Sequence, residues 1–423
     1  MLPASLNSPA TFTNGAYTIQ GLNLADLCEK FGTPFYLYDL DYCVGRYRFL
    51  HDLFDLPNVR LHYAVKANNN PHLLLALKES GACLDVVSPS EVALALALGF
   101  DPSRLLYTAN NMTDAEIRLI RDQGLLLNID SLTGLRRYAK LYPNTELCLR
   151  FNSDVVAGEH EKVMTGGDKT KFGIRLEKVD EVLDIVHASG LKIVGVHEHT
   201  GSGITDPNQF IQGMKNLLTI VTPARFPDLR FIDFGGGFKV PYRPDEKRID
   251  YVAFGQKVSA MLRAFFADFG RELALYFEPG KFIVAEGGLL MVQVNSLIEN
   301  KTRLIAGTDS GFGHLVRPVL YNAYHHILNV SNPKGAAKTY DICGNICETG
   351  DLFAEDRGMP EIREGDYLAL LNAGAYGYSM ASDYNLRPKP AEVVVQNGKA
   401  FLSRKPHTPQ EIVSNVLLQS GLK

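Results

Sequence analysis

Between residues 59 and 280, short apolar runs alternate with stretches that have the 3.6-residue spacing of amphipathic helices. The apolar runs cover residues 59–66, 83–88, 105–110, 126–130, 146–152, 192–200, 229–237 and 274–280. The helical stretches include PHLLLALKES (71–80), PSEVALALALGF (89–100) and QFIQGMKNLLTIV (209–221). Continuous apolar strands that alternate with helices indicate a parallel sheet covered on both faces.

Polar residues gather at the C-terminal ends of the apolar runs. These residues are Lys66, Ser88, Asp130, Arg150, His197, His199, Gly235–Gly237 and Glu278. Eight strand–helix units close a (β/α)8 barrel, and barrel enzymes build their active sites at the C-terminal ends of the strands. An open doubly wound sheet would give the same alternation, but polar groups at so many strand ends favour the barrel.

The pattern changes after Glu278. Segments such as 282–298, 366–374 and 391–404 are rich in β-forming residues, with no long helical stretches between most of them. We therefore expect a barrel over residues 35–282 and an antiparallel, β-barrel-like domain over 283–423. Residues 1–34 are expected to join the β domain, with TNGAYTIQG (13–21) supplying it a strand.

Composition and charge narrow the classes of function. The chain is 46% hydrophobic and 21% charged, and its net charge of -4 indicates no basic surface for nucleic acid or an anionic membrane. We read no signal peptide and no apolar stretch of the ~18 residues that span a bilayer, so we expect a cytoplasmic enzyme. The six cysteines are too sparse for a disulfide scaffold, and CGNIC (343–347) lacks a second pair at zinc spacing, so no metal is expected.

Two glycine-rich segments indicate a phosphate site. HTGSG (199–203) follows the sixth strand and DFGGG (233–237) ends the seventh. Glycine lets backbone N–H groups approach an anion closely, and Ser202 adds a hydroxyl donor. Either segment alone would be read as a tight turn, but the pair at adjacent strand ends favours phosphate.

Lys66 and Glu278 indicate carbonyl chemistry at the same end of the barrel. A lysine in a partly desolvated pocket loses its proton more easily and can bind a carbonyl group covalently. Glu278 can hold a pyridine nitrogen protonated, which makes the ring an electron sink. The structural alternatives are a snorkelling lysine and a salt bridge. His199 can stack on a cofactor ring, whereas we expect His197 to point to the other face of its strand.

The motifs resemble those of the fold-type III pyridoxal-phosphate-dependent decarboxylases, and among them the diaminopimelate decarboxylase family. The barrel motifs that match, in order, are YAVKAN (63–68), KFGI (171–174), HTGSG (199–203), DFGGG (233–237) and EPGK (278–281). Those of the second domain are RPVLY (317–321), CETGD (347–351) and GAYGYSMASDYNLRP (374–388). The resemblance implies a barrel followed by a β domain, as in alanine racemase and ornithine decarboxylase.

The resemblance implies pyridoxal 5'-phosphate as cofactor and assigns a role to each matching residue. Lys66 matches the lysine that binds the cofactor covalently, and Cys347 the acid that returns a proton to the α-carbon. The residues that match cofactor contacts are Lys66, His199, Ser202, Gly237, Glu278, Gly280, Lys281 and Tyr376. Those that match substrate contacts are Lys281, Arg317, Tyr321, Glu348 and Tyr376. In the family the Cys-Glu pair reaches the site of the partner subunit, which implies a homodimer with its active site at the interface.

Three positions depart from the family pattern. Lys281 replaces the usual arginine and keeps the charge, but it loses the bidentate geometry toward a carboxylate. Thr349 replaces serine and keeps the hydroxyl, whereas we have no physical account of Asp383 in place of asparagine.

The expected reaction is decarboxylation of meso-2,6-diaminopimelate to L-lysine and carbon dioxide, the last step of lysine biosynthesis. Two cations, Arg317 and Lys281, would face the distal end of the substrate. A hydrogen bond to a charged group is worth about 1.5–3 kcal/mol. Substrates without a distal carboxylate should therefore be disfavoured.

Other functions stay open at this point. A decarboxylase of ornithine, arginine, lysine or a siderophore precursor would fit CETGD equally well. An alanine-racemase-like enzyme shares the barrel but has no use for an acid such as Cys347. A pyridoxal-phosphate carrier would need no second domain. Glu91 either lines the cofactor pocket or caps a helix, and residues 160–174 are expected to form a mobile loop over the site.

Overall fold

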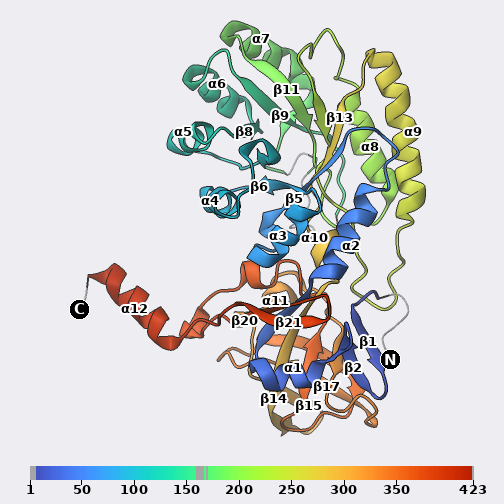
Figure 1. The fold of residues 1–423 in the computed structure, drawn as a ribbon, viewed down its shortest axis with the longest axis vertical. Helices are drawn as coiled ribbons and strands as arrows, with labels where there is room; N and C mark the ends of the chain where they lie inside the picture. Colours follow the sequence, from blue (N-terminus) through green and yellow to red (C-terminus); the bar gives the residue numbers. More distant parts are fainter. Residues whose placement is uncertain (1–5, 159–165, 168–169, 422–423) are drawn as a thin grey trace.

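The barrel predicted from the alternating pattern is present in the computed structural model, which describes residues 6–158, 166–167 and 170–421 (Figure 1). Its eight parallel strands are β5 (Val59–Ala64), β6 (Cys83–Val86), β7 (Leu105–Tyr107), β8 (Leu126–Ile129), β9 (Glu146–Asn152), β11 (Lys192–His197), β12 (Phe231–Asp233) and β13 (Ala274–Phe277). The sheet closes because β13 pairs with β5 and β8 pairs with β9. A short strand, β10 (Ile174–Arg175), extends β9 on its outer side.

Helices cover the outside of the barrel, as the apolar spacing predicts. They are α2 (Leu40–His51), α3 (Pro71–Glu79), α4 (Pro89–Ala97), α5 (Asp114–Asp122), α6 (Leu132–Leu141), α7 (Val179–Ser189), α8 (Pro207–Leu218) and α9 (Tyr251–Phe269). Most begin at a side chain that accepts a hydrogen bond from the first turn; Ser88 does so for α4 and Asp206 for α8. Such caps start each helix a few residues after its strand, which leaves the strand ends open to a common space.

The second domain contains a mixed sheet. Its strands are β4 (Phe35–Asp39), β14 (Gly288–Glu299), β15 (Leu304–Thr308), β16 (Ile327–Asn329), β17 (Ala337–Cys343), β18 (Leu352–Pro360), β19 (Tyr367–Leu370), β20 (Ala391–Gln396) and β21 (Lys399–Arg404). They are ordered β18-β17-β15-β14-β4-β20-β21, and β19 pairs with β14 and β16. The prediction of an antiparallel domain is wrong for two pairs, because β4 runs parallel to β20 and β15 runs parallel to β17. Parallel neighbours need long connections, and the whole barrel lies between β4 and β20.

The N-terminal segment differs from the expectation in its pairing. The strands β1 (Ala10–Thr13), β2 (Ala16–Ile19) and β3 (Leu22–Asn23) form a three-stranded sheet of their own, followed by α1 (Leu24–Phe31). Tyr17 and Ile19 are nevertheless buried in one apolar cluster with Phe35 and Leu37 of β4. The segment therefore packs on the β domain without joining its sheet. The strand at residues 35–39, placed in the barrel segment by the sequence, hydrogen-bonds within the second sheet instead.

Helix α12 (Pro409–Ser420) was not expected from the β-rich pattern, and it extends away from the body of the molecule (Figure 1). Two short helices, α10 (Lys281–Val284) and α11 (Arg317–Tyr321), lie where the two domains meet. In the described part of the chain, no helix is both long and apolar enough to cross a membrane. The loop predicted at residues 160–174 falls largely outside the described residues.

Candidate active site

A cavity of about 520 Å³ opens at the C-terminal ends of the barrel strands and is walled on its other side by the second domain. Ten of the residues expected at the site border it: Lys66, His199, Ser202, Gly237, Glu278, Gly280, Lys281, Arg317, Tyr321 and Tyr376. Residues more than 300 positions apart in the sequence thus line one cavity. A cavity of this size accommodates a cofactor together with a small substrate.

Lys66 sits in a single helical turn (Val65–Ala67) that follows β5. Its side chain is 43% exposed, and its ammonium group contacts the buried carboxylate of Asp85 on the neighbouring strand β6. Burial alone would lower the pKa of Lys66, but the carboxylates of Asp85 and Glu278 outweigh it and the pKa is raised. The prediction that this lysine loses its proton more easily is therefore wrong for the arrangement seen here.

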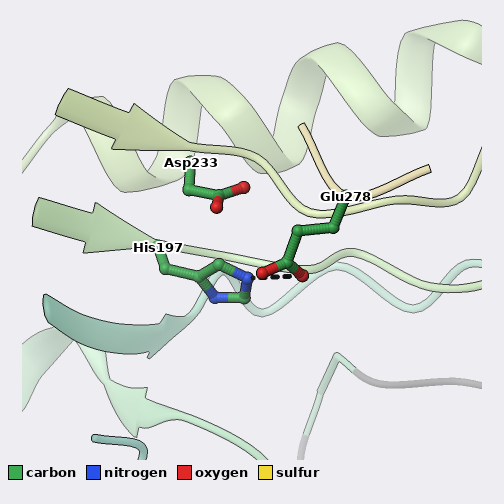
Figure 2. Close-up of side chains that lie close together, drawn as sticks. All are labelled: His197, Asp233 and Glu278. Atoms are coloured by element: carbon green, nitrogen blue, oxygen red, sulfur yellow. Dashed lines mark hydrogen bonds and ion pairs between the residues drawn. The ribbon is translucent and has the colours of Figure 1, made fainter. Parts of the chain in front are cut away.

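Glu278, His197 and Asp233 converge from the ends of three adjacent strands (Figure 2). Nε2 of His197 lies 3.1 Å from Oε2 of Glu278, and the hydroxyl of Thr108 donates to Oε1 at 3.2 Å. His197 points into the barrel, so the prediction that it faces the other side is wrong. Residues two positions apart on a strand share a face, and His197 and His199 are such a pair.

The three groups differ in charge. Burial alone would raise the pKa of Glu278. The neighbouring His197 and Lys66 outweigh burial and lower this pKa below its ordinary value, so Glu278 is ionised. Burial and the charge of Glu278 raise the pKa of Asp233 well above its ordinary range, which favours its protonated form. The ligand atoms of the three residues lie within 4.8 Å of one another, close enough to hold a cation. A protonated Asp233 is a poor metal ligand, and an ionised Glu278 at the cavity wall suits a protonated ring nitrogen better.

The loop that follows β12 lies too close to the loops after β11 and β13 for side chains. A Cβ atom at Gly236 would come within 2.5 Å of the carbonyl oxygen of Glu278. At Gly237, where φ is 106°, a Cβ atom would meet the carbonyl oxygen of Gly201 at 2.6 Å. This glycine backbone borders the cavity beside Ser202, which is the arrangement that lets N–H groups reach a phosphate.

His199 is held by the same backbone. The N–H of Gly236 donates to Nδ1 of His199 at 3.1 Å, so Nδ1 carries no hydrogen. Burial and the charge of Arg150 lower the pKa of His199 well below its ordinary range, which keeps the ring neutral. A neutral imidazole on the cavity wall is suited to stack on a cofactor ring.

Two cations from the second half of the chain also border the cavity. Lys281, the first residue of α10, is 7% exposed, and Arg317, the first residue of α11, is 4% exposed. Tyr376 borders the cavity too, and its backbone N–H donates to the carbonyl oxygen of Ala67 at 2.8 Å. This bond ties the second domain directly to the turn that carries Lys66.

Cys347 and Glu348 do not border the cavity of their own chain. Both are exposed, with Sγ of Cys347 3.5 Å from Oδ1 of Asn385 and Glu348 accepting from the hydroxyl of Tyr384. Asp351 fixes this segment by accepting from the backbone N–H groups of Ile346 and Phe312 at 2.8 and 2.6 Å. The pair is therefore presented on the surface of the second domain.

Sequence reasoning missed several residues at the site. Asp85, Thr108 and Tyr242 contact or border the positions described above without having been singled out. A lone carboxylate within an apolar strand was the available signal for Asp85. Glu91 accepts from the backbone N–H of Val87 at 2.8 Å and does not border the cavity, so the helix-capping interpretation is the one the structure supports.

Comparisons with known proteins agree with this site. A family model described as the pyridoxal-binding domain of pyridoxal-dependent decarboxylases matches residues 44–285. The diaminopimelate decarboxylase of Methanothermobacter thermautotrophicus is 40% identical over 94% of this chain and 95% of its own length. The crystal structure of the Helicobacter pylori diaminopimelate decarboxylase with L-lysine gives a TM-score of 0.87 at 31% identity, covering 95% of this chain and 100% of that one. The corresponding complex from M. jannaschii gives 0.90 at 28% identity, with full coverage of both chains.

Proposed function

Because this chain belongs to the diaminopimelate decarboxylases within the pyridoxal-dependent decarboxylase family, we propose that it converts meso-2,6-diaminopimelate to L-lysine and carbon dioxide. This reaction is the last step of lysine biosynthesis. The observation that carries the proposal is one cavity bordered by Lys66, Glu278, Arg317 and Lys281.

The residues at the barrel end fit pyridoxal 5'-phosphate. The glycine backbone at 235–237 and Ser202 would hold the phosphate, His199 would stack on the ring, and Lys66 would bind the carbonyl carbon. Glu278, ionised and buried, would keep the ring nitrogen protonated. When bound, the cofactor supplies an electron sink for the electron pair left on the α-carbon after carbon dioxide departs.

The wall formed by α10 and α11 suits the distal end of the substrate. That end of diaminopimelate carries a carboxylate and an amine, whereas an ornithine or lysine substrate presents only an amine there. Arg317 and Lys281 are both buried, and a hydrogen bond to a charged group is worth about 1.5–3 kcal/mol, so the two cations favour a substrate that brings a carboxylate. Tyr321 and Tyr376 would position the same end by their hydroxyl groups.

The exposed position of Cys347 supports a homodimer with composite sites. In this arrangement Cys347 of one subunit enters the cavity of the other and returns a proton to the α-carbon, while Glu348 holds the substrate amine. Each cavity would then be complete only in the dimer. The cytoplasmic location stays a prediction.

Release of carbon dioxide by the cofactor-loaded protein tests the proposal directly. Meso-diaminopimelate, L-lysine, L-ornithine and L-arginine are compared at equal concentration, with Lys66→Ala as the control for cofactor-dependent turnover. Release from diaminopimelate alone is expected and shows that Lys281 serves in place of arginine. Release from another of these amino acids, or from none, contradicts the proposed substrate.

A further inference from the structure

His325 contacts Arg317 in the second domain and is not among the residues described above. Nη1 of Arg317 lies 3.2 Å from Nε2 of His325, and the guanidinium carbon of Arg317 lies 4.5 Å from the centre of the Tyr242 ring. Arg317 and Tyr242 border the cavity, whereas His325 is 0% exposed behind them. The guanidinium of Arg317 is thus held by two contacts, a hydrogen bond with His325 and the ring of Tyr242.

The tautomer of His325 follows from its second contact. Nδ1 lies 2.8 Å from the carbonyl oxygen of Leu371, and a carbonyl oxygen can only accept, so Nδ1 carries the hydrogen. Burial and the charge of Arg317 lower the pKa of His325 to about 3, which leaves Nε2 with a free electron pair. The N–H of Arg317 therefore donates to Nε2. Unlike a carboxylate, this neutral acceptor fixes the guanidinium without cancelling its charge.

His325 is itself fixed by the sheet of the second domain. Its carbonyl oxygen accepts from Nη1 of Arg357 at 2.8 Å, and its ring meets the Tyr242 ring at 90° with centres 5.6 Å apart. The next residue, His326, accepts from the N–H of Leu371 at 2.8 Å and continues the pairing of β16 with β19. The position of the imidazole is thus set by the register of two strands.

We infer that His325 is a positioning residue that orients Arg317 toward the distal carboxylate of the substrate, through an N–H donated by Arg317 to Nε2. This inference rests on the proposed function, because it gives Arg317 a carboxylate to bind. A residue that does not touch the substrate would then contribute to the discrimination between substrates, through Arg317.

Two substitutions separate the two hydrogen bonds of His325. In His325→Asn the side-chain amide replaces Nδ1 and can donate to Leu371, but nothing reaches Arg317. In His325→Gln the longer side chain places a carbonyl oxygen near the position of Nε2 and restores an acceptor for Arg317. His326→Asn is the matched control, because His326 is adjacent in the chain and its side chain contacts Tyr324 and not Arg317.

Binding of L-lysine and of cadaverine to the holoenzyme, measured by calorimetry, is the readout. L-lysine keeps the carboxylate at the end away from the reaction, and cadaverine is the same chain without it. We expect His325→Asn to weaken L-lysine binding about ten- to a hundred-fold, the range for a hydrogen bond to a charged group. Cadaverine binding should be unchanged in this variant, and both ligands should bind unchanged to His326→Asn.

A double-mutant cycle with Arg317→Ala distinguishes positioning from a general structural role. If His325 acts through Arg317, His325→Asn adds no further loss of L-lysine binding once Arg317 is removed. Full additivity, an equal loss for cadaverine, or binding to His325→Gln as weak as to His325→Asn overturns the inference. A wild-type holoenzyme that binds cadaverine as tightly as L-lysine contradicts the proposed function instead.

Discussion

His197 and Glu278 face each other inside the barrel, with 3.1 Å between Nε2 and Oε2, although 81 residues separate them in the chain. Their strands are not direct neighbours, since β12 lies between β11 and β13. The contact therefore depends on both side chains pointing inward at the same height. It stabilises the ionised form of Glu278 at the cavity wall.

Glu278→Gln should lower kcat with diaminopimelate by about a hundred-fold or more, because a neutral amide does not keep a ring nitrogen protonated. The measurement is steady-state carbon dioxide release at saturating cofactor. Glu198→Gln is the control, since Glu198 is also a buried carboxylate at the end of a barrel strand but does not border the cavity. A Glu278→Gln enzyme with wild-type kcat would contradict the role given to this carboxylate.

Asp85→Asn should lower the pKa of the Lys66 amine, because the Asp85 carboxylate is the neighbouring group that raises this pKa most. Only the neutral amine attacks a carbonyl carbon. The rate at which pyridoxal phosphate attaches to the apoprotein, trapped by borohydride reduction, should therefore reach half its maximum at a lower pH than in the wild type. Asp130→Asn, at the end of β8 and bonded to Asn110, serves as the matched control. An unchanged or higher midpoint for Asp85→Asn would show that Asp85 does not set this pKa.

Composite active sites predict complementation between two inactive variants. Lys66→Ala and Cys347→Ala are each expected to be inactive alone, but a mixed dimer of the two contains one site with both wild-type residues. Random exchange of subunits should restore about a quarter of the wild-type activity, since half of the dimers are mixed and each holds one intact site. The activity is followed after mixing under conditions that allow subunit exchange, and no recovery despite proven exchange would place both residues in one subunit's site.

Glu198 predicts a pH dependence of stability that is independent of catalysis. Burial raises its pKa from 4.5 to about 7, although the hydroxyls of Ser153 and Thr200 donate to its carboxylate and oppose the shift. The folded state then binds a proton that the unfolded state has released, so this contribution to stability is lost as the pH rises from 4.5 to 7. Relative to the wild type, Glu198→Gln should gain up to about 3 kcal/mol across that window.

The melting temperatures of wild type and Glu198→Gln at pH 5 and pH 8 test this prediction. The melting temperature of Glu198→Gln, relative to that of the wild type, should be higher at pH 8 than at pH 5. For Glu364→Gln, at an exposed turn, the difference from the wild type should be the same at both pH values. A constant difference for Glu198→Gln as well would mean that Glu198 stays ionised when buried.

The sequence was sufficient to predict the barrel and most of the cavity because their signals are local. Lys66 and Glu278 each end an apolar run. The alternation of strands and helices predicts a barrel, in which the C-terminal ends of all the strands lie at the same face. Asp85 was missed because a carboxylate in the middle of a run carries no such positional signal. His325 was missed because its role arises from the pairing of β16 with β19, which brings together residues about 40 positions apart in the chain.

The errors have similar physical origins. The parallel pairing of β4 with β20 could not be predicted from the strand-forming residues. Such residues indicate that a segment forms a strand, but not which other strand it pairs with or in which direction. Helix α12 was missed because it packs little: among its residues only Ile412 is buried, so the apolar spacing that identifies a helix against a core is weak.

The central place of β4 makes the second domain inseparable from the N-terminus of the chain. Phe35–Asp39 lies between β14 and β20, and every other strand of that sheet comes from residues 288–404. A fragment that begins at residue 288 would therefore leave two half-sheets, each with an unpaired apolar edge of the kind that promotes aggregation. During synthesis β4 is made early, but its partner β20 is made only after the barrel and most of the second domain. This domain can therefore complete its fold only after the barrel has been synthesised.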